Sequence, residues 1–211
     1  MMFIQKYVSM KLSLLPLLAS LIFSCGQNNQ VQSKTQVFQN QENPINNQNM
    51  KKSLYNQSFE IKTISGEEFD FNTLKEKRLL IVNTASLCGY TPQYKELQEL
   101  HSLLGRENFA VIGFPANNFG NQEPSNNSSI AEFCSKNYGV EFLMMEKISV
   151  KGADMHPLYQ WLTKKELNGV EDSEVKWNFQ KFLIDENGYL IDVLPSSESP
   201  LSEKITSFAK G

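Results

Sequence analysis

Two apolar runs in the middle of the chain each predict a buried strand. The first covers residues 78–86, and the second covers residues 109–114 and is closed by Pro115. Runs without polar alternation are typical of strands that are covered on both faces of a sheet. Between them, apolar residues recur at helical spacing over residues 92–104. Strand, helix and strand in this order predict a βαβ unit with parallel pairing and a right-handed crossover.

The segments on either side of this unit predict two hairpins. Alternating apolar residues over residues 58–71, with a turn signal at Ser65-Gly66, indicate one of them. Strands at 179–185 and 189–194 around the tight turn Glu186-Asn187-Gly188 indicate the other. Helical spacing predicts three further helices, over residues 128–137, 157–163 and 201–209. The order of elements predicts an α/β thioredoxin-like fold, with a central mixed sheet flanked by helices and an N-terminal β-hairpin.

Residues 1–25 have the pattern of a lipoprotein-type signal peptide. Two lysines precede a short apolar stretch that ends at Cys25, and this stretch is too short to span a bilayer as a helix. The ending Leu21-Ile22-Phe23-Ser24-Cys25 resembles the bacterial lipobox. We expect cleavage before Cys25, lipidation of that cysteine, and a position on the periplasmic side of a bacterial membrane. An ordinary signal peptide is the alternative, and the sequence leaves Met1 and Met10 open as the start.

The remainder of the chain divides into a tether and one domain. Residues 26–51 are rich in Asn and Gln, so they cannot bury enough apolar surface to offset the entropy of ordering, and we expect a disordered tether. Residues 52–211 have the length of one ordinary domain. The net charge is −3, and the chain has no basic block. Nucleic acid is therefore not an expected partner.

Cys88 lies where reactive chemistry is expected. It follows the strand at 78–86 and precedes a predicted helix, for which Thr91 would be the N-cap and Pro92 the first residue. A thiol near the positive end of a helix dipole is favoured as thiolate, its nucleophilic form. If Cys25 is lipidated, two thiols remain, and in a domain with an ample core they indicate chemistry rather than a disulfide scaffold. A buried structural cysteine is the alternative interpretation.

Three stretches of the sequence resemble the signature motifs of the glutathione peroxidase family. They are Asn83-Thr84-Ala85-Ser86-Leu87-Cys88-Gly89-Tyr90-Thr91, Gly120-Asn121-Gln122-Glu123-Pro124 and Trp177-Asn178-Phe179-Gln180-Lys181-Phe182-Leu183. The motifs occur in the family's order, and the resemblance runs from about Leu54 to Phe208. The resemblance implies that Cys88 is the reactive thiol and that Gln122, Trp177 and Asn178 are its catalytic partners. It implies no cofactor and no metal.

These residue types suit the reduction of peroxides. A thiolate attacks the O–O bond and is left as a sulfenic acid. The amide groups of Gln122 and Asn178 and the indole N–H of Trp177 are donors that can stabilise the thiolate and the departing oxygen. The chain has only two histidines, both outside the motifs, which disfavours a hydrolase with a histidine base. A dithiol oxidoreductase would need a second cysteine three residues after Cys88, where the sequence has Thr91.

The resemblance also implies how the enzyme is recycled. Cys134 matches the resolving cysteine of those members that form an internal disulfide and are recharged by thioredoxin. A small buried packing residue is the alternative interpretation of Cys134. The short segment at 162–176 resembles the monomeric members, and no compact Arg/Lys cluster for glutathione accompanies the motifs. We therefore expect a monomeric peroxidase that uses a Cys88–Cys134 disulfide and a thioredoxin-like reductant, with glutathione as the alternative reductant.

The expected substrates are hydrogen peroxide and organic or lipid hydroperoxides. A lipid anchor on Cys25 and a flexible tether would hold the site near a bilayer, which favours phospholipid hydroperoxides. If Cys134 resolves the sulfenic acid, its helix must unwind locally, because a disulfide requires Cα atoms within about 7 Å. A lipoprotein that senses or binds peroxide without efficient turnover is the alternative function.

Overall fold

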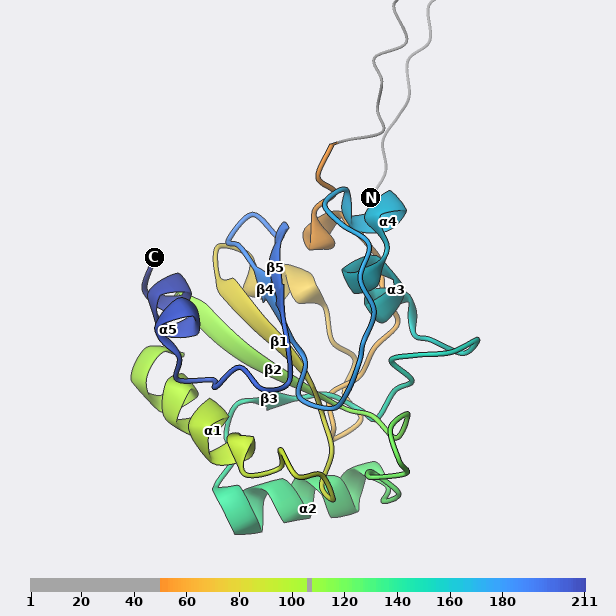
Figure 1. The fold of residues 1–211 in the computed structure, drawn as a ribbon, viewed down its shortest axis with the longest axis vertical. Helices are drawn as coiled ribbons and strands as arrows, with labels where there is room; N and C mark the ends of the chain where they lie inside the picture. Colours follow the sequence, from red (N-terminus) through yellow and green to blue (C-terminus); the bar gives the residue numbers. More distant parts are fainter. Residues whose placement is uncertain (1–49, 106–107) are drawn as a thin grey trace, which may run out of the picture. The chain divides into compact units, whose positions relative to one another are not determined.

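A five-stranded mixed sheet lies at the centre of the residues that the computed structural model describes, 50–105 and 108–211. Its strands are β1 (Arg78–Thr84), β2 (Phe109–Pro115), β3 (Leu143–Met144), β4 (Lys181–Ile184) and β5 (Leu190–Leu194). Their order in the sheet is β3-β2-β1-β4-β5 (Figure 1). The β1–β2 and β2–β3 pairs are parallel, whereas β1–β4 and β4–β5 are antiparallel. This is the thioredoxin-like α/β fold that the sequence predicts.

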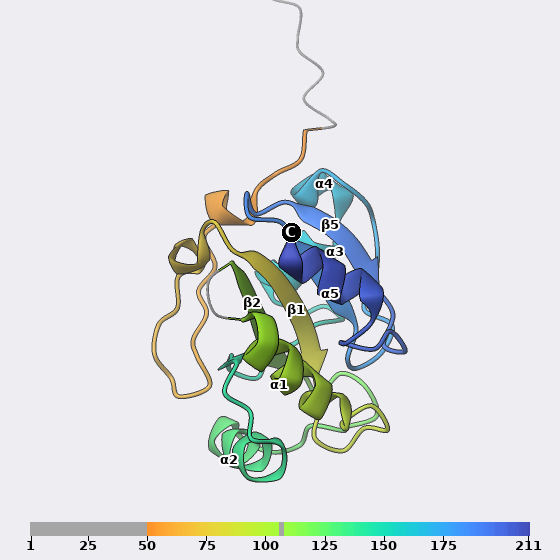
Figure 2. The same ribbon diagram turned by 90° about the vertical axis from the view of Figure 1, so that its left-hand side faces the viewer.

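Helices cover both faces of this sheet (Figures 1 and 2). They are α1 (Gln93–Leu104), α2 (Asn127–Tyr138), α3 (Pro157–Thr163), α4 (Lys165–Asn168) and α5 (Glu203–Lys210), with short 3₁₀ helices at Leu54–Asn56 and Phe71–Leu74. Alternate residues of β1 point to opposite faces. Leu80 and Val82 pack with α1, α2 and α5, whereas Leu79 and Ile81 pack with α3 and the N-terminal segment. The apolar run of β1 is therefore buried from both sides.

Most of the predicted elements are confirmed, with small shifts at their ends. The strand–helix–strand unit is present, with β1 and β2 parallel and in register from Arg78 opposite Phe109, and α3 has its predicted bounds. The N-terminal hairpin turns where predicted, at Gly66, whose φ of +91° suits glycine. Its ladder is shorter than predicted, with a bridge between Lys62 and Glu68. Strand β3 was not predicted, because two residues are too few to show a period.

The predictions for the N-terminal part of the chain cannot be compared with this fold. The signal peptide at residues 1–25, including Cys25, and residues 26–49 of the tether lie outside the described residues. Within the described parts, no helix combines the length and the apolar character that a membrane span requires.

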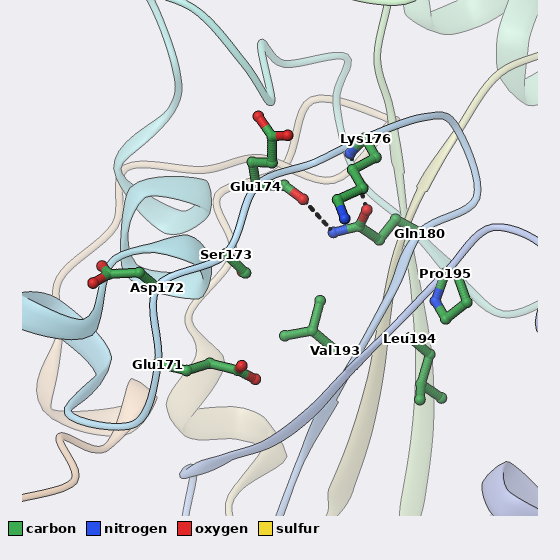
Figure 3. A pocket seen from close by; sticks show the side chains of 9 residues that line it. All are labelled: Glu171, Asp172, Ser173, Glu174, Lys176, Gln180, Val193, Leu194 and Pro195. Atoms are coloured by element: carbon green, nitrogen blue, oxygen red, sulfur yellow. Dashed lines mark hydrogen bonds between the residues drawn. The ribbon is translucent and has the colours of Figure 1, made fainter.

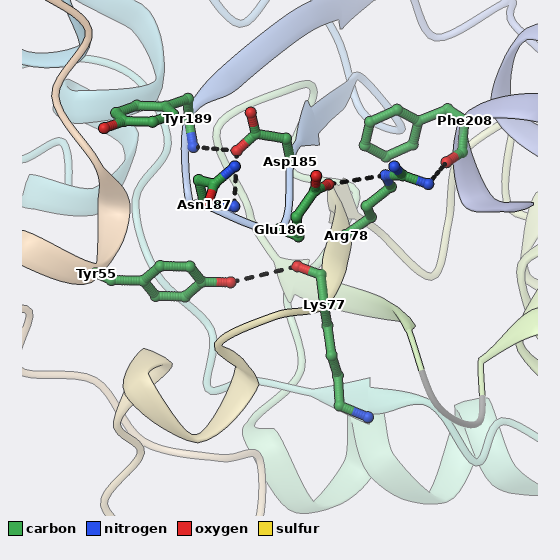
Figure 4. A network of polar contacts seen from close by, with 8 residues as sticks. All are labelled: Tyr55, Lys77, Arg78, Asp185, Glu186, Asn187, Tyr189 and Phe208. Carbon is green, nitrogen blue, oxygen red and sulfur yellow. Dashed lines mark hydrogen bonds and ion pairs between the residues drawn. The ribbon is translucent and has the colours of Figure 1, made fainter. Parts of the chain in front are cut away.

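A polar network holds the end of the sheet where β1 begins (Figure 4). Arg78 Nε pairs with Glu186 at 3.0 Å, and an Arg78 guanidinium N–H reaches the carbonyl of Phe208 in α5 at 3.4 Å. The Tyr55 hydroxyl donates to the carbonyl of Leu74 at 2.9 Å. Burial, with the nearby carboxylates of Asp185 and Glu186, raises the pKa of Tyr55 to about 12. The network joins the N-terminal segment, the β4–β5 turn and α5 at the edge opposite Cys88.

The central strand provides a direct test of the fold. We expect Ile81→Ala to lower the free energy of unfolding by about 2–5 kcal/mol, since it removes a fully buried side chain and leaves a cavity. Ile191→Ala is the matched control: Ile191 is 42% exposed on β5, and its loss should cost less than about 0.5 kcal/mol. Chemical denaturation of both variants measures the difference. Equal effects would contradict the placement of β1 at the centre.

Candidate active site

Three loops meet at one edge of the sheet and carry the residues that the motifs identify. Cys88 follows β1, and Gln122 follows β2, whose carboxyl end lies beside that of β1 because the two strands are parallel. Trp177 and Asn178 immediately precede β4, which is antiparallel to β1 with Val82 opposite Lys181. The start of β4 therefore lies at the same edge as the ends of β1 and β2.

The loop of Cys88 is closed by the side chain of Thr91. The Thr91 hydroxyl accepts a hydrogen bond from the Cys88 N–H at 3.0 Å and donates to the Ala85 carbonyl at 2.9 Å. The prediction that Thr91 caps the helix is wrong: α1 begins at Gln93 after Pro92 and has no side-chain cap. The hydroxyl is engaged in the loop instead. The Cys88 sulfur accepts a hydrogen bond from the Tyr90 N–H at 3.4 Å, and Cys88 is 8% exposed.

Gln122 and Asn178 are joined directly. The Asn178 side-chain amide donates to Gln122 Oε1 at 2.9 Å, and Asn178 is fully buried. The Gln122 carbonyl accepts the N–H of Leu87, the neighbour of Cys88, at 3.0 Å. Gly120, with a φ of +62°, allows the left-handed turn that leads to Gln122. These bonds connect all three loops.

Trp177 lies at the surface of the site, in a turn of residues 177–179 (the Trp177 turn) that Asn83 of β1 holds in place. Trp177 is 40% exposed, and its ring lies 5.6 Å from that of Phe119. The Asn83 side-chain amide donates to the Trp177 carbonyl at 3.0 Å, and the Asn83 carbonyl accepts the Phe179 N–H at 2.6 Å. Phe179 has a φ of +65°, a left-handed conformation that costs a bulky residue about 1–2 kcal/mol. The two bonds from Asn83 hold this strained turn in place.

The four motif residues are therefore brought to one edge, but they are not all in contact with the sulfur. Among the described residues, the sulfur takes its hydrogen bond from the backbone of Tyr90, and the amides of Gln122 and Asn178 bond to each other. Gln122 Nε2 makes no hydrogen bond within the described residues.

Cys134 lies on α2, buried and reduced. It is 2% exposed, and it belongs to the same buried cluster as Cys88 and Tyr94 of α1. Both cysteines are free thiols. Burial raises the pKa of the Cys134 thiol to about 11, and the nearby Glu123 carboxylate raises it as well. In this conformation Cys134 is a protonated thiol without access to solvent.

Two polar residues of the site were missed by the sequence analysis. Asn83 is a buried amide in an otherwise apolar strand, which is the signal that could have identified it. Glu123 is fully buried and accepts a hydrogen bond from the Ser86 hydroxyl at 2.9 Å, and its other carboxylate oxygen has no partner within residues 50–105 and 108–211. Burial raises the pKa of Glu123. The sequence feature that could have identified Glu123 is its place as an acidic residue inside the Gly-Asn-Gln-Glu-Pro motif.

A cavity of about 600 Å³ lies beside the Trp177 turn but does not contain Cys88 (Figure 3). It lies between residues 171–176 and the end of β5. Gln180 spans its edge, donating to the Glu174 carbonyl and accepting the Lys176 N–H, each at 2.9 Å. The described residues contain no cluster of His, Cys, Asp and Glu suited to a metal ion.

Comparisons with known proteins agree with this geometry. Residues 54–163 match the family model described as glutathione peroxidase. The chain is 47% identical over 146 residues to "Glutathione peroxidase homolog BsaA" of Halalkalibacterium halodurans, covering 69% of this chain and 92% of that protein. It is 46% identical over 143 residues to "Glutathione peroxidase-like peroxiredoxin 2" of Saccharomyces cerevisiae, covering 68% and 88%. The crystal structure of "Trgpx in apo form" aligns with a TM-score of 0.57 at 36% identity, covering 75% of this chain and 97% of that chain.

The thioredoxin-like fold, the free thiol in its closed loop and these relatives define a thiol peroxidase that reduces hydroperoxides. More particularly, the chain belongs to the glutathione peroxidase family.

The amide pair predicts a defect in the first chemical step. We expect Asn178→Ala to slow the oxidation of Cys88 by hydrogen peroxide about 100-fold, because a donor is lost and Gln122 loses its partner. Asn187→Ala in the exposed β4–β5 turn is the control and should react at the wild-type rate. Rapid mixing followed by thiol trapping measures both. A wild-type rate in a folded Asn178→Ala variant would contradict a role for Asn178.

Proposed function

We propose that this peroxidase uses a two-cysteine cycle. The Cys88 thiolate attacks the peroxide O–O bond, releases an alcohol or water, and becomes a sulfenic acid. Cys134 attacks the sulfenic sulfur, so that an S–S bond forms and water leaves. A thioredoxin-like dithiol then reduces the disulfide by thiol exchange. The observation that carries this proposal is the pair of free thiols within one buried cluster, one of them in the loop that the Thr91 hydroxyl closes.

Gln122, Trp177 and Asn178 serve as donors for the first step in this proposal. The Asn178–Gln122 bond at 2.9 Å orients the Gln122 amide and leaves its N–H₂ group available. Trp177 presents an indole N–H, which is a donor only. Donors fixed before the reaction stabilise charge as it develops on the departing oxygen. The hydrogen-bonded amide pair supports this assignment.

The second step requires α2 to open. Cys134 is buried, and α2 is capped at one end by the Asn126 side chain, which accepts the Ser129 N–H at 3.0 Å, and at the other by Gly139 with a φ of +61°. Yet Ile130 and Cys134 are the buried residues among the twelve of α2. Phe133 and Tyr138 also pack against the buried cluster that contains Cys134 but stay partly exposed, so α2 has few fully buried contacts to lose when it opens. This supports Cys134 as a resolving thiol that is released by local unwinding.

The N-terminal part of the proposal rests on the sequence. Cleavage of the signal at residues 1–25, lipidation of Cys25 and the tether at residues 26–51 would place a monomeric domain on the periplasmic side of a bacterial membrane. Leu87 is 64% exposed and Trp177 40%, and both lie next to motif residues. Exposed apolar side chains in these motif loops suit an acyl chain, which supports phospholipid hydroperoxides as substrates.

The choice of reductant is tested by removing the second thiol. We expect the purified protein to consume hydrogen peroxide in an NADPH-coupled assay with thioredoxin and thioredoxin reductase, but far more slowly with glutathione and glutathione reductase. Cys134→Ser should lose at least 90% of thioredoxin-supported turnover, while its Cys88 still reacts once with peroxide, because no disulfide can form.

Three other results would change the assignment. Full turnover of Cys134→Ser with thioredoxin would remove the two-cysteine cycle. Turnover with glutathione alone would retain the peroxidase and make Cys134 a packing residue. A single reaction of Cys88 without turnover in either system would favour a peroxide sensor.

Substitution of Cys25 tests whether the protein is anchored by a lipid. In a bacterial host with a lipoprotein pathway, we expect the wild-type chain to fractionate with membranes and to incorporate labelled palmitate, whereas Cys25→Ser should do neither. Reconstituted on vesicles that contain phospholipid hydroperoxide, the lipidated protein should reduce that substrate faster than Cys25→Ser does, and both should reduce hydrogen peroxide equally. Equal membrane association of the two forms would contradict lipidation at Cys25.

A further inference from the structure

Lys181 is a fully buried lysine immediately beyond the Trp177 turn, and the peroxidase mechanism above gives it no role. Its ammonium donates to Gln93 Oε1 at 2.8 Å, to the Phe179 carbonyl at 2.8 Å and to the Ser196 carbonyl at 3.4 Å. All three acceptors are uncharged. A buried ammonium without a carboxylate partner is costly to retain, so its retention calls for a reason other than stability.

The three acceptors belong to three separate segments around the site. Gln93 begins α1, five residues after Cys88, and Ser196 follows β5. Phe179 is the strained residue with a φ of +65° that ends the Trp177 turn. The Gln93 side chain also donates to the Ser196 carbonyl at 2.8 Å. The ammonium is therefore the point at which the helix after the reactive thiol and the donor-bearing turn are tied together.

The Trp177 turn is consequently held from two sides. Asn83 binds the Trp177 carbonyl and the Phe179 N–H from β1, and Lys181 binds the Phe179 carbonyl from β4. A strained backbone conformation persists only where several surrounding contacts hold it in place. Asn178 lies between these anchors, and its side-chain amide donates to Gln122 Oε1 at 2.9 Å.

We propose that Lys181 is a positioning residue of the peroxidase, whose buried ammonium fixes the turn of Trp177 and Asn178 against α1. It acts through Phe179 and Gln93 and does not touch the peroxide. Substitution of Lys181 releases the strained turn, and the Asn178–Gln122 bond loses its support.

The charge state of Lys181 gives this role a signature in the pH profile. Burial lowers the pKa of Lys181 to about 8, whereas the carboxylates of Glu198 and Glu96 raise it. These are the charged groups that face the ammonium from the loop after β5 and from α1; its strand partners, Val82 of β1 and Leu194 of β5, are apolar. The lysine is charged below about pH 8 and neutral above it. Loss of the proton weakens the charge-assisted bonds, so reactivity should decline above that pH.

The experiment measures a single oxidation of Cys88 by hydrogen peroxide between about pH 6 and pH 10, in the full chain. This half-reaction needs no reductant, so its outcome does not depend on how the enzyme is recycled. We expect Lys181→Met to react at least tenfold more slowly than wild type at pH 7 and to lack the alkaline decline. Lys95→Met removes an exposed lysine from the same helix as Gln93, and as the control it should stay within twofold of wild type.

A second variant separates positioning from packing, and it decides the question if Lys181→Met does not fold. Gln93→Glu places a carboxylate 2.8 Å from the ammonium in place of an amide oxygen, so Lys181 should keep its proton to higher pH. We expect its alkaline decline to move upward by at least one pH unit. A wild-type rate in Lys181→Met would overturn the proposal. So would a decline that is absent from the wild type, or one that occurs at the same pH in wild type and Gln93→Glu.

Discussion

The site is organised around Asn83, a buried asparagine at the end of an apolar central strand. Its side chain and its backbone carbonyl hold the Trp177–Phe179 turn, and the strand to which it belongs runs directly into the Cys88 loop. One residue therefore relates the Cys88 loop to the turn that carries Trp177 and Asn178. A buried amide is costly unless it is hydrogen-bonded. The bond to the Trp177 carbonyl satisfies the Asn83 N–H₂ group, whereas its Oδ1 has no partner among the described residues.

The mixed character of the sheet makes this arrangement possible. In a parallel pair the carboxyl ends of β1 and β2 lie together, and the antiparallel β4 adds the segment that precedes it to the same edge. Residues 88, 122 and 178 are far apart in the sequence, but each lies three to seven residues from a strand end at that edge. The rigid centre is secured at the opposite edge by the Arg78 network, away from the chemistry.

Polar groups are concentrated in the dry interior beneath the site. Glu123, Lys181 and the Cys134 thiol are all buried there, and burial shifts the pKa of each toward its uncharged form. Violations of the rule that interiors are apolar are expected where function requires them. Here Lys181 bonds to the strained turn at Phe179, and burial raises the pKa of the Cys134 thiol.

The pattern of apolar residues by itself determined the order of the elements, the parallel unit and the bounds of α3, because these depend on local periodicity. The resemblance of three motifs to the glutathione peroxidase family also grouped Cys88, Gln122, Trp177 and Asn178 as candidate site residues. Only the tertiary structure decided that Thr91 closes the Cys88 loop instead of capping α1, that Asn178 bonds to Gln122, and that Lys181 joins three segments. The Asn178–Gln122 bond connects positions 56 residues apart. Such a bond cannot be predicted from local sequence, because it depends on how the strands pair and on which buried polar groups meet.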